Sequence, residues 1–139
     1  AYISQETELF DLSIRENLCL GKDISDNVLM QYLEDAGLAL WINNLENGLD
    51  TVVGEKGIKL STGQKQRLNI IRGILLDKDI YIFDEPTSNL DILSENNICV
   101  MIAKYLKNKT CIIVTHKQKL LSICNKHYFF ENKVLLEKN

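Results

Sequence analysis

The chain has 139 residues, of which 45% are hydrophobic and 25% are charged, and its formal net charge is −3. These values predict one compact domain with its own core and exclude disorder over most of the chain. The slight acidity argues against a nucleic-acid partner, no apolar run reaches the ~20 residues of a membrane-spanning helix, and the first residues carry no secretory signal. A start at Ala1 rather than at Met leads us to expect a longer gene product.

Helix signals dominate the first half of the chain. Residues 13–16 have the spacing of a capping box and predict a short helix through Leu18. Ser25 precedes an apolar stripe at helical spacing that ends at Gly37. Residues 61–64 form a second capping box, followed by a helix whose apolar residues are Leu68, Ile71, Ile74 and Leu75.

The second half adds a longer helix and a short one. The long helix is predicted over about residues 90–106, and the residues expected to face inward are Leu93, Met101, Ile102, Tyr105 and Leu106. Residues 115–118 form a third capping box, which predicts a further helix start.

Short apolar runs bounded by polar residues predict strands at 2–3, 80–83, 111–114 and 128–130. The last run and residues 134–136 flank a polar turn, which predicts a hairpin. The order strand, long helix, strand predicts a right-handed crossover and a mainly parallel sheet. The expected fold class is therefore α/β, with a mostly helical first half.

The cysteines and a stretch of lysines can be explained without a functional site. The four cysteines (Cys19, Cys99, Cys111 and Cys124) form no CxxC motif, so reduced and buried thiols are expected, with zinc binding or disulfides as alternatives. A loose basic stretch is interpreted as a solvated face. It consists of Lys104, Lys107, Lys109, Lys117 and Lys119.

Asp84 and Glu85 follow the predicted strand 80–83 and precede Pro86, the single proline. Open α/β sheets bind ligands at the carboxyl ends of their strands. The side chains of adjacent residues diverge there, so one carboxylate can face a metal while the other faces a water. The alternative is a strand end that is merely solvated by acidic residues, but Pro86 fixes the exit of the chain and favours a built site.

The capped helix start at 61–64 suits an anion. Ser61, Thr62, Gly63 and Gln64 place free backbone N–H groups at the positive end of a helix, which favours phosphate. Taken alone, the pattern is also that of an ordinary helix cap.

Four stretches taken together, LSTGQ at 60–64, QR at 66–67, FDEPTSNLD at 83–91 and VTH at 114–116, closely resemble the nucleotide-binding domain of ATP-binding-cassette (ABC) transporters. The resemblance covers essentially the whole chain. It implies a P-loop NTPase (RecA-like) core with the ABC helical subdomain, and the cofactors ATP and Mg²⁺.

The resemblance also assigns roles. Ser61, Thr62, Gly63 and Gln64 match the signature loop, which contacts ATP held by a second nucleotide-binding domain in a head-to-tail dimer. Thr62 stands where Gly is commoner. Residues 88–91, ending in Asp91, match the D-loop at the dimer interface, with Asn89 where a small Ala is usual.

The resemblance places the catalytic groups near the strand ends. Asp84 matches the Walker B aspartate that holds Mg²⁺ through water, and Glu85 matches the general base. His116 matches the switch histidine at the γ-phosphate, although alone it would be interpreted as a histidine at a helix start. Gln5 matches the Q-loop glutamine, which reaches Mg²⁺ and senses the transmembrane domain.

Exporter-type features are present as well. Residues 51–57 resemble the segment before the signature that contacts the intracellular loops of an exporter, and the run containing Phe10 and residues 13–17 supports this. The resemblance therefore implies an ATPase subunit of an exporter, at the cytoplasmic face of a membrane. The alternatives are a soluble ABC ATPase without transmembrane partners and a non-catalytic interaction fragment.

No P-loop of the form G-x-x-x-x-G-K-[ST] occurs in the sequence. The chain is therefore expected to be a truncated domain, inactive alone, with the Q-loop, helical subdomain and signature helix at about 6–76 and the second half of the ATPase core at about 77–139. Without the P-loop strand, strand 111–114 would have an unpaired edge. We expect that edge to pair with a second copy of the chain or with the hairpin at 128–136.

Overall fold

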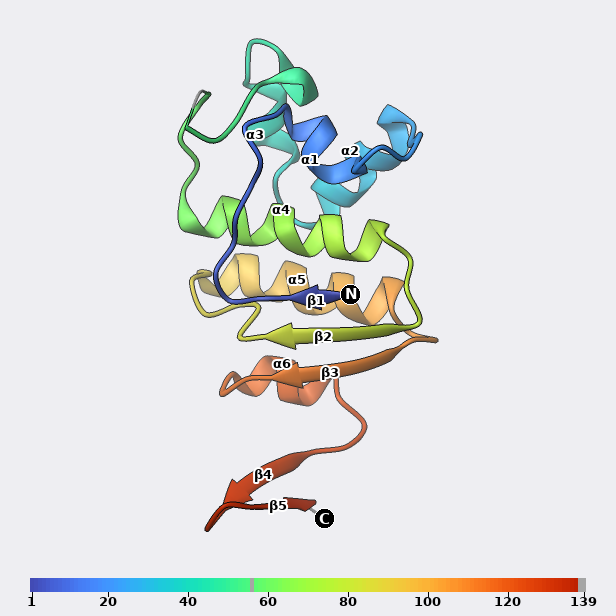
Figure 1. Cartoon of the computed structure of the whole chain (residues 1–139), viewed down its shortest axis with the longest axis vertical. Coiled ribbons are helices and arrows are strands. Elements are labelled where there is room, and N and C mark those ends of the chain that lie inside the picture. The colour runs from blue at the N-terminus through green and yellow to red at the C-terminus, as the bar shows by residue number, and fades with distance from the viewer. Residues whose placement is uncertain (56, 138–139) are drawn as a thin grey trace.

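The computed structural model describes residues 1–55 and 57–137. The elements are β1 (Tyr2–Ile3), α1 (Ile14–Cys19), α2 (Asp26–Asp35), α3 (Ala39–Asn43), the 3-10 helix η1 (Gly48–Asp50), α4 (Thr62–Leu75), β2 (Ile80–Asp84), α5 (Ile92–Tyr105), β3 (Thr110–Val114), α6 (Gln118–Ser122), β4 (Tyr128–Glu131) and β5 (Val134–Glu137). Figure 1 shows α1–α3 gathered at one end, α4 between them and the sheet, and the β4–β5 hairpin at the other end.

Strands β1, β2 and β3 form a parallel sheet in that order. In its register, Ile82 of β2 lies between Tyr2 of β1 and Ile112 of β3. The succession β2, α5, β3 is the predicted strand–helix–strand crossover, so the α/β class and the parallel sheet are confirmed. β1 comes from the largely helical first half of the chain and completes the sheet.

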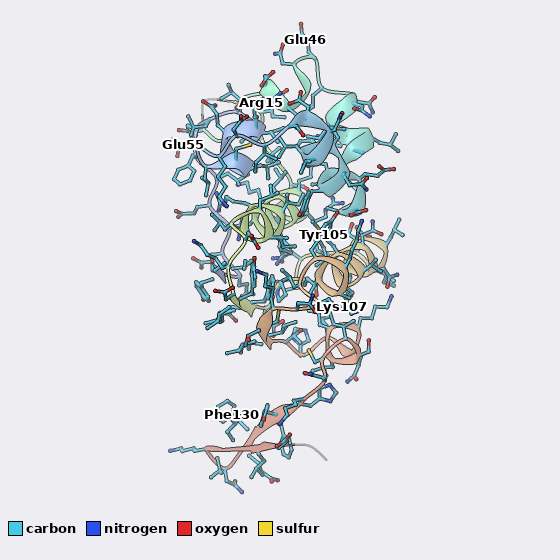
Figure 2. All side chains as sticks on the ribbon, turned by 90° about the vertical axis from the view of Figure 1, so that its right-hand side faces the viewer. Arg15, Glu46, Glu55, Tyr105, Lys107 and Phe130 are labelled. Carbon is cyan, nitrogen blue, oxygen red and sulfur yellow. The ribbon has the colours of Figure 1, made fainter. Side chains whose placement is uncertain are left out.

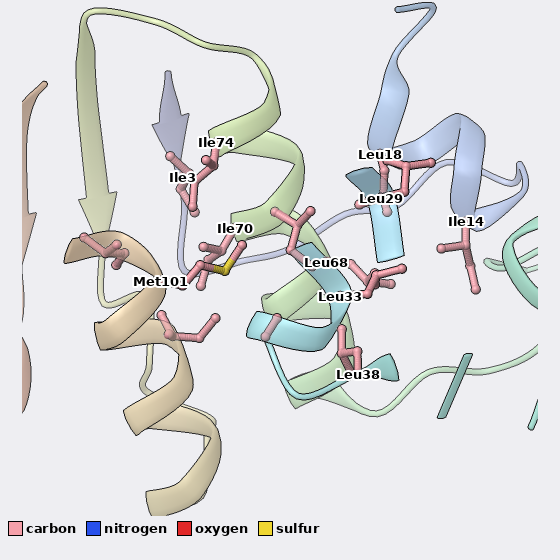
Figure 3. Close-up of a cluster of buried hydrophobic side chains, with 14 of the residues drawn as sticks. Ile3, Ile14, Leu18, Leu29, Leu33, Leu38, Leu68, Ile70, Ile74 and Met101 are labelled. Carbon is pink, nitrogen blue, oxygen red and sulfur yellow. The ribbon is translucent and has the colours of Figure 1, made fainter. Parts of the chain in front are cut away.

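The two faces of the sheet differ in what covers them. On one face, Ile3 lies close to Ile70 and Ile74 of α4 (Figure 3). Helix α4 approaches β1 so closely at Gly73 that a Cβ there would lie 2.8 Å from Ile3 Cγ1. The other face presents exposed apolar side chains, namely Tyr2, Ile80, Ile82, Ile112 and Val114. A sheet face of this composition is normally covered by another layer.

The capping boxes predicted at residues 13–16 and 61–64 are both formed. Ser13 Oγ accepts a hydrogen bond from Glu16 N at 3.1 Å, while Glu16 Oε2 accepts one from Ser13 N at 2.8 Å. Ser61 and Gln64 exchange the corresponding bonds at 3.1 and 2.9 Å. Gly37 has a φ of +70° just after α2, in agreement with the predicted stop. The sequence patterns do not predict α3 or η1.

Two helix predictions are wrong. Leu93, expected to face inward, is 71% exposed, because it lies on the side of α5 opposite the buried Ile102. The third capping box is not formed either. Thr115 Oγ1 accepts a hydrogen bond from Lys117 N at 3.0 Å, which makes a local turn, and α6 begins at Gln118 with no side-chain cap.

The predicted hairpin is formed by β4 and β5. Glu131 pairs with Val134 around a two-residue loop in which Asn132 and Lys133 have φ values of +48° and +66°, as hairpin turns require. Every residue of both strands is exposed, and Figure 2 shows Phe130 well apart from the rest of the molecule. Within the described residues the hairpin does not pair with β3, so the expectation that it closes against strand 111–114 is wrong for a single copy.

Candidate functional site

Asp84 and Glu85 lie at the carboxyl end of the central strand β2. Glu85 has a φ of +48° and its N–H donates to Val114 O at 2.9 Å, so the chain turns sharply after Asp84 and the two side chains diverge. The Tyr2 hydroxyl donates to Asp84 Oδ2 at 3.3 Å. Burial, together with the Asp84 carboxylate, raises the pKa of Tyr2. The two carboxylates therefore have different neighbours.

Glu85 and His116 face each other from the segments that follow the adjacent strands β2 and β3. Glu85 Oε1 lies 2.9 Å from Nδ1 of His116, and the side chains of Glu85 and His116 are 21% and 72% exposed. The second carboxylate oxygen, Glu85 Oε2, is buried and has no hydrogen-bond partner among the described residues. Leaving such an oxygen unsatisfied is unfavourable, and a water molecule or ligand could supply the missing donor. A carboxylate held in this way can take up a proton from a water molecule at its other oxygen.

Gln66, on the inner side of α4, holds the turn that follows Glu85. Its Nε2 donates to Glu85 O at 3.1 Å, and its Oε1 accepts from Asn89 N at 3.3 Å. The Gln66 side chain is buried, and both bonds are partly buried. Sequence reasoning assigned Gln66 no role. The available signals were the QR pair at 66–67, which is part of the resemblance, and an amide side chain within a predicted amphipathic helix.

The signature residues lie at the start of α4. Ser61 and Thr62 are exposed, and Gly63 lies against the turn after β2, where a Cβ would be 3.4 Å from Asn89 O. Arg67 donates to Ala36 O at 3.2 Å, which ties this helix to the end of α2. In one chain, therefore, the signature residues adjoin the D-loop segment, but no hydrogen bond joins them to Glu85 or His116 in the described residues.

Two other predicted residues lie at the margin of this region. Asp91 is the N-cap of α5, and its carboxylate accepts hydrogen bonds from Ser94 N and Oγ, each at 2.9 Å. These bonds, chiefly the one from the Ser94 backbone, lower the pKa of Asp91. Gln5 is exposed on the loop after β1. Asp84, Glu85 and His116 are thus brought together, whereas the Asp91 carboxylate is engaged within its own helix.

Asp84 is the group best placed to serve a metal ion. No group of three or more His, Cys, Asp or Glu side chains among residues 1–55 and 57–137 could hold an ion by itself. Mg²⁺ typically takes one or two carboxylates and fills its other positions with water and phosphate oxygens. A single aspartate at the strand end, beside a carboxylate that lacks a donor at Oε2, fits such a site.

A pocket of about 480 Å³ lies between the loop after β1 and α4. Its lining includes Tyr2, Phe10 and Arg72. Arg72 donates to Glu8 O at 3.0 Å and stands 5.7 Å from the Phe10 ring centroid, whereas its buried Nη1 has no partner among the described residues. Burial lowers the pKa of Arg72. The pocket lining therefore includes the Arg72 guanidinium, whose Nη1 has no acceptor among the described residues.

A sequence profile of the ABC transporter family matches residues 1–88, and the chain therefore belongs to this family. It is 37% identical over 139 residues to an ATP-dependent lipid A-core flippase of Pseudoalteromonas translucida, covering 99% of this chain and 24% of the flippase. It is 43% identical over 118 residues to P-glycoprotein 14 of Caenorhabditis elegans, covering 84% of this chain and 9% of the P-glycoprotein.

Among solved structures, a bacterial Atm1-family ABC exporter with ATP bound superimposes with a TM-score of 0.85 at 31% identity, over 98% of this chain and 24% of the exporter. The fold is thus that of part of an ABC nucleotide-binding domain, which confirms the resemblance. The chain spans about a quarter of the length of the flippase. In the described part of the chain, no helix combines the length and apolarity that crossing a membrane requires.

Proposed function

We propose that the chain is part of the ATP-hydrolysing subunit of an ABC exporter, which couples ATP binding and hydrolysis to substrate transport across a membrane. The observation that carries the proposal is the Glu85–His116 pair beside Asp84 at the carboxyl edge of a parallel sheet. Residues 6–76 would contain the Q-loop, helical subdomain and signature helix, and 77–139 the second half of the ATPase core. The domain would lie at the cytoplasmic face of the membrane.

In this proposal Glu85 is the general base. Its Oε1 is held by His116, and Oε2, which lacks a donor, accepts the proton of the attacking water. His116 is exposed enough to contact the γ-phosphate as well. Asp84, with Gln5, would hold Mg²⁺ through water, and bound Mg²⁺ supplies positive charge that offsets the charge of the phosphates.

The partner for the signature residues would be a second nucleotide-binding domain. Ser61, Thr62, Gly63 and Gln64 lie at the N-terminal end of α4, where unpaired N–H groups and the helix dipole favour a phosphate. Because no hydrogen bond joins them to Glu85 of the same chain, ATP bound by a head-to-tail partner is the better ligand. Asp91 would contribute at the same interface through the D-loop.

The transmembrane domain would dock beside the Q-loop. The 480 Å³ pocket next to Gln5 contains Arg72, whose free Nη1 could donate to a backbone carbonyl or carboxylate of a docking segment. Residues 51–57 would contact the intracellular loops, and Lys56 within this segment lies outside the described residues.

The isolated chain should be inactive. A P-loop, whose backbone and Lys hold the β- and γ-phosphates, is absent from the sequence. The sheet has an exposed apolar face, and no strand in the described part of the chain pairs with the outer edge of β3. Both features support a domain that is completed by further structure.

The test is ATP hydrolysis by the full transporter that contains this chain. Glu85→Gln should lower turnover by roughly 10²–10⁴-fold while ATP binding is retained, because the isosteric amide cannot accept the proton. His116→Ala should also slow turnover. Glu46→Gln, at an exposed position far from the sheet (Figure 2), is the matched control.

Turnover of Glu85→Gln within a few-fold of the unaltered protein would exclude Glu85 as the base. Full activity in a parent protein that has no transmembrane partner would favour a soluble ABC ATPase. An intact parent without any ATP turnover would favour a non-catalytic interaction role.

A further inference from the structure

Helix α5 carries apolar side chains on the side that faces away from the sheet. Its inner side contributes Ile98 and Met101 to the core. On its outer side, Ile92, Leu93 and Val100 are 75%, 71% and 66% exposed. A surface helix normally turns polar residues to water, and a helix that is apolar on opposite sides is normally covered on both.

These residues form a continuous row. Ile92, Asn96 and Val100 follow one another at spacings of four, and Leu93 stands seven residues before Val100, so all four share one side of the helix. Figure 1 shows α5 behind the sheet, which leaves this side directed away from the strands. We call this row the outer face of α5. None of its residues is among those proposed to contact nucleotide or metal.

Lysines border the outer face of α5. Lys104 follows Val100 by four residues on α5, Lys107 lies in the turn just after the helix, and Lys119 of α6 donates to Asn96 in the middle of the row. Lys104 pairs with Asp35, but Lys107 and Lys119 have no acidic partner among the described residues. The outer face is therefore an apolar row with unpaired positive charge at its centre and at its C-terminal end.

We propose that the outer face of α5 binds an acidic amphipathic helix of a partner protein. The apolar side of that helix packs on Ile92, Leu93 and Val100, and its carboxylates meet Lys107 and Lys119. Charge complementarity selects this occupant over a second copy of the chain. A self-complementary contact would offer the lysines only Asp91 at the start of the row, whose carboxylate already accepts two hydrogen bonds from Ser94, because Glu95 of α5 is buried.

The probe is a synthetic amphipathic helical peptide with a leucine stripe flanked by glutamates, titrated into the 139-residue chain by isothermal calorimetry. Its control is the same peptide with lysines in place of the glutamates. The glutamate peptide should bind at least about tenfold more tightly. Val100→Glu should weaken that binding by about tenfold or more, and Lys107→Glu should weaken it and reduce its dependence on salt.

The matched control variant is Leu40→Glu, on α3, where the native side chain is 81% exposed. It should bind the glutamate peptide as the unaltered chain does, and circular dichroism should show the same helix content in all variants. Equal affinity for both peptides, no binding, or equal effects of Val100→Glu and Leu40→Glu would overturn the proposal. Binding to vesicles containing phosphatidylglycerol that Val100→Glu abolishes, without peptide binding, would also overturn it and assign the face to an anionic lipid surface.

Discussion

The hydroxyl of Tyr105 donates to Asp35 Oδ2 at 2.6 Å and so connects the end of α5 to the end of α2. Lys104 pairs with the same carboxylate oxygen at 2.6 Å, and the ring of Tyr105 stacks on Tyr32 with centroids 4.3 Å apart. Figure 2 shows Tyr105 on the side of α5 that faces the other helices. This cluster joins the helical part of the chain to the sheet layer.

Asp35→Asn should lower the free energy of unfolding at pH 7 by about 1–2 kcal/mol, because Lys104 and Tyr105 lose an ionised acceptor. Burial opposes ionisation of Asp35, but the hydrogen bonds from Lys104 and Tyr105 outweigh it and lower the pKa of Asp35. A lowered pKa gives stability that is complete above the unfolded pKa of about 3.9 and is lost as the pH falls through the folded pKa.

The measurement is urea unfolding of the unaltered chain, Asp35→Asn and Glu46→Gln across pH 3 to 7. The gap between the unaltered chain and Asp35→Asn should be widest above about pH 5 and should close in acid. The exposed Glu46 serves as the control. A gap that stays constant over this range would rule out the ionised Asp35 cluster as its cause.

The contacts in the cluster of Tyr32, Asp35, Lys104 and Tyr105 could not be predicted from the sequence. Apolar spacing predicted α2, α5 and the strands, because helical and strand periods are local properties of the chain. It did not predict that Asp35 and Tyr105 meet, since they are separated by 69 intervening residues and only the packing of α2 on α5 joins them. The prediction for Leu93 is wrong for a related reason: apolar spacing does not distinguish the core side of α5 from its outer side, which is apolar as well.

The candidate site divides in the same way. The FDEP run placed Asp84 and Glu85 at the carboxyl end of a strand, and the resemblance to the ABC family added His116 at the end of the next strand. The QR pair at 66–67 was part of the resemblance but gave no role to Gln66, which acts through backbone groups of the turn after β2. Backbone N–H and C=O groups are the same whatever the residue type. Hydrogen bonds to them therefore leave no pattern in the sequence of the turn.

Gln66→Leu should destabilise the chain by about 1–3 kcal/mol, because Asn89 N and Glu85 O each lose a partly buried hydrogen bond. In the full transporter the same variant should lower ATP turnover, since the turn that aims Glu85 loses its support. Gln118→Leu, at an exposed position, is the matched control and should stay within about 0.5 kcal/mol. Chemical unfolding and steady-state ATPase rates measure the two effects. If both variants behave alike, Gln66 does not support the turn.

The isolated chain should bind MgATP weakly or not at all. Asp84 and His116 supply only a few contacts to a triphosphate, whereas the missing P-loop would supply most of them through its backbone N–H groups. Calorimetric titration with ATP and Mg²⁺ should show no saturable heat in the low micromolar range. Stoichiometric, high-affinity binding would contradict this and would require a phosphate site built from the present residues.

The outer edge of β3 should make the isolated chain self-associate. Thr110 N donates to Asp79 O and Val114 O accepts from Glu85 N, so the even-numbered residues of β3 direct their backbone groups toward β2. By the alternation of a parallel ladder, the backbone groups of Cys111 and Ile113 point to the outer edge, where no strand of the described chain pairs with them.

An unpaired edge beside an exposed apolar face recruits another strand. In the isolated chain the available strands are those of a second copy, either through its own β3 edge or through its exposed β4–β5 hairpin. Sedimentation velocity over increasing concentration should therefore show dimers or larger species. Ile112→Lys places a charge on the apolar face beside this edge and should shift the distribution toward monomer, whereas Leu40→Lys on α3 should not. A chain that stays monomeric at all concentrations, or that responds equally to both substitutions, would show that the β3 edge does not drive association.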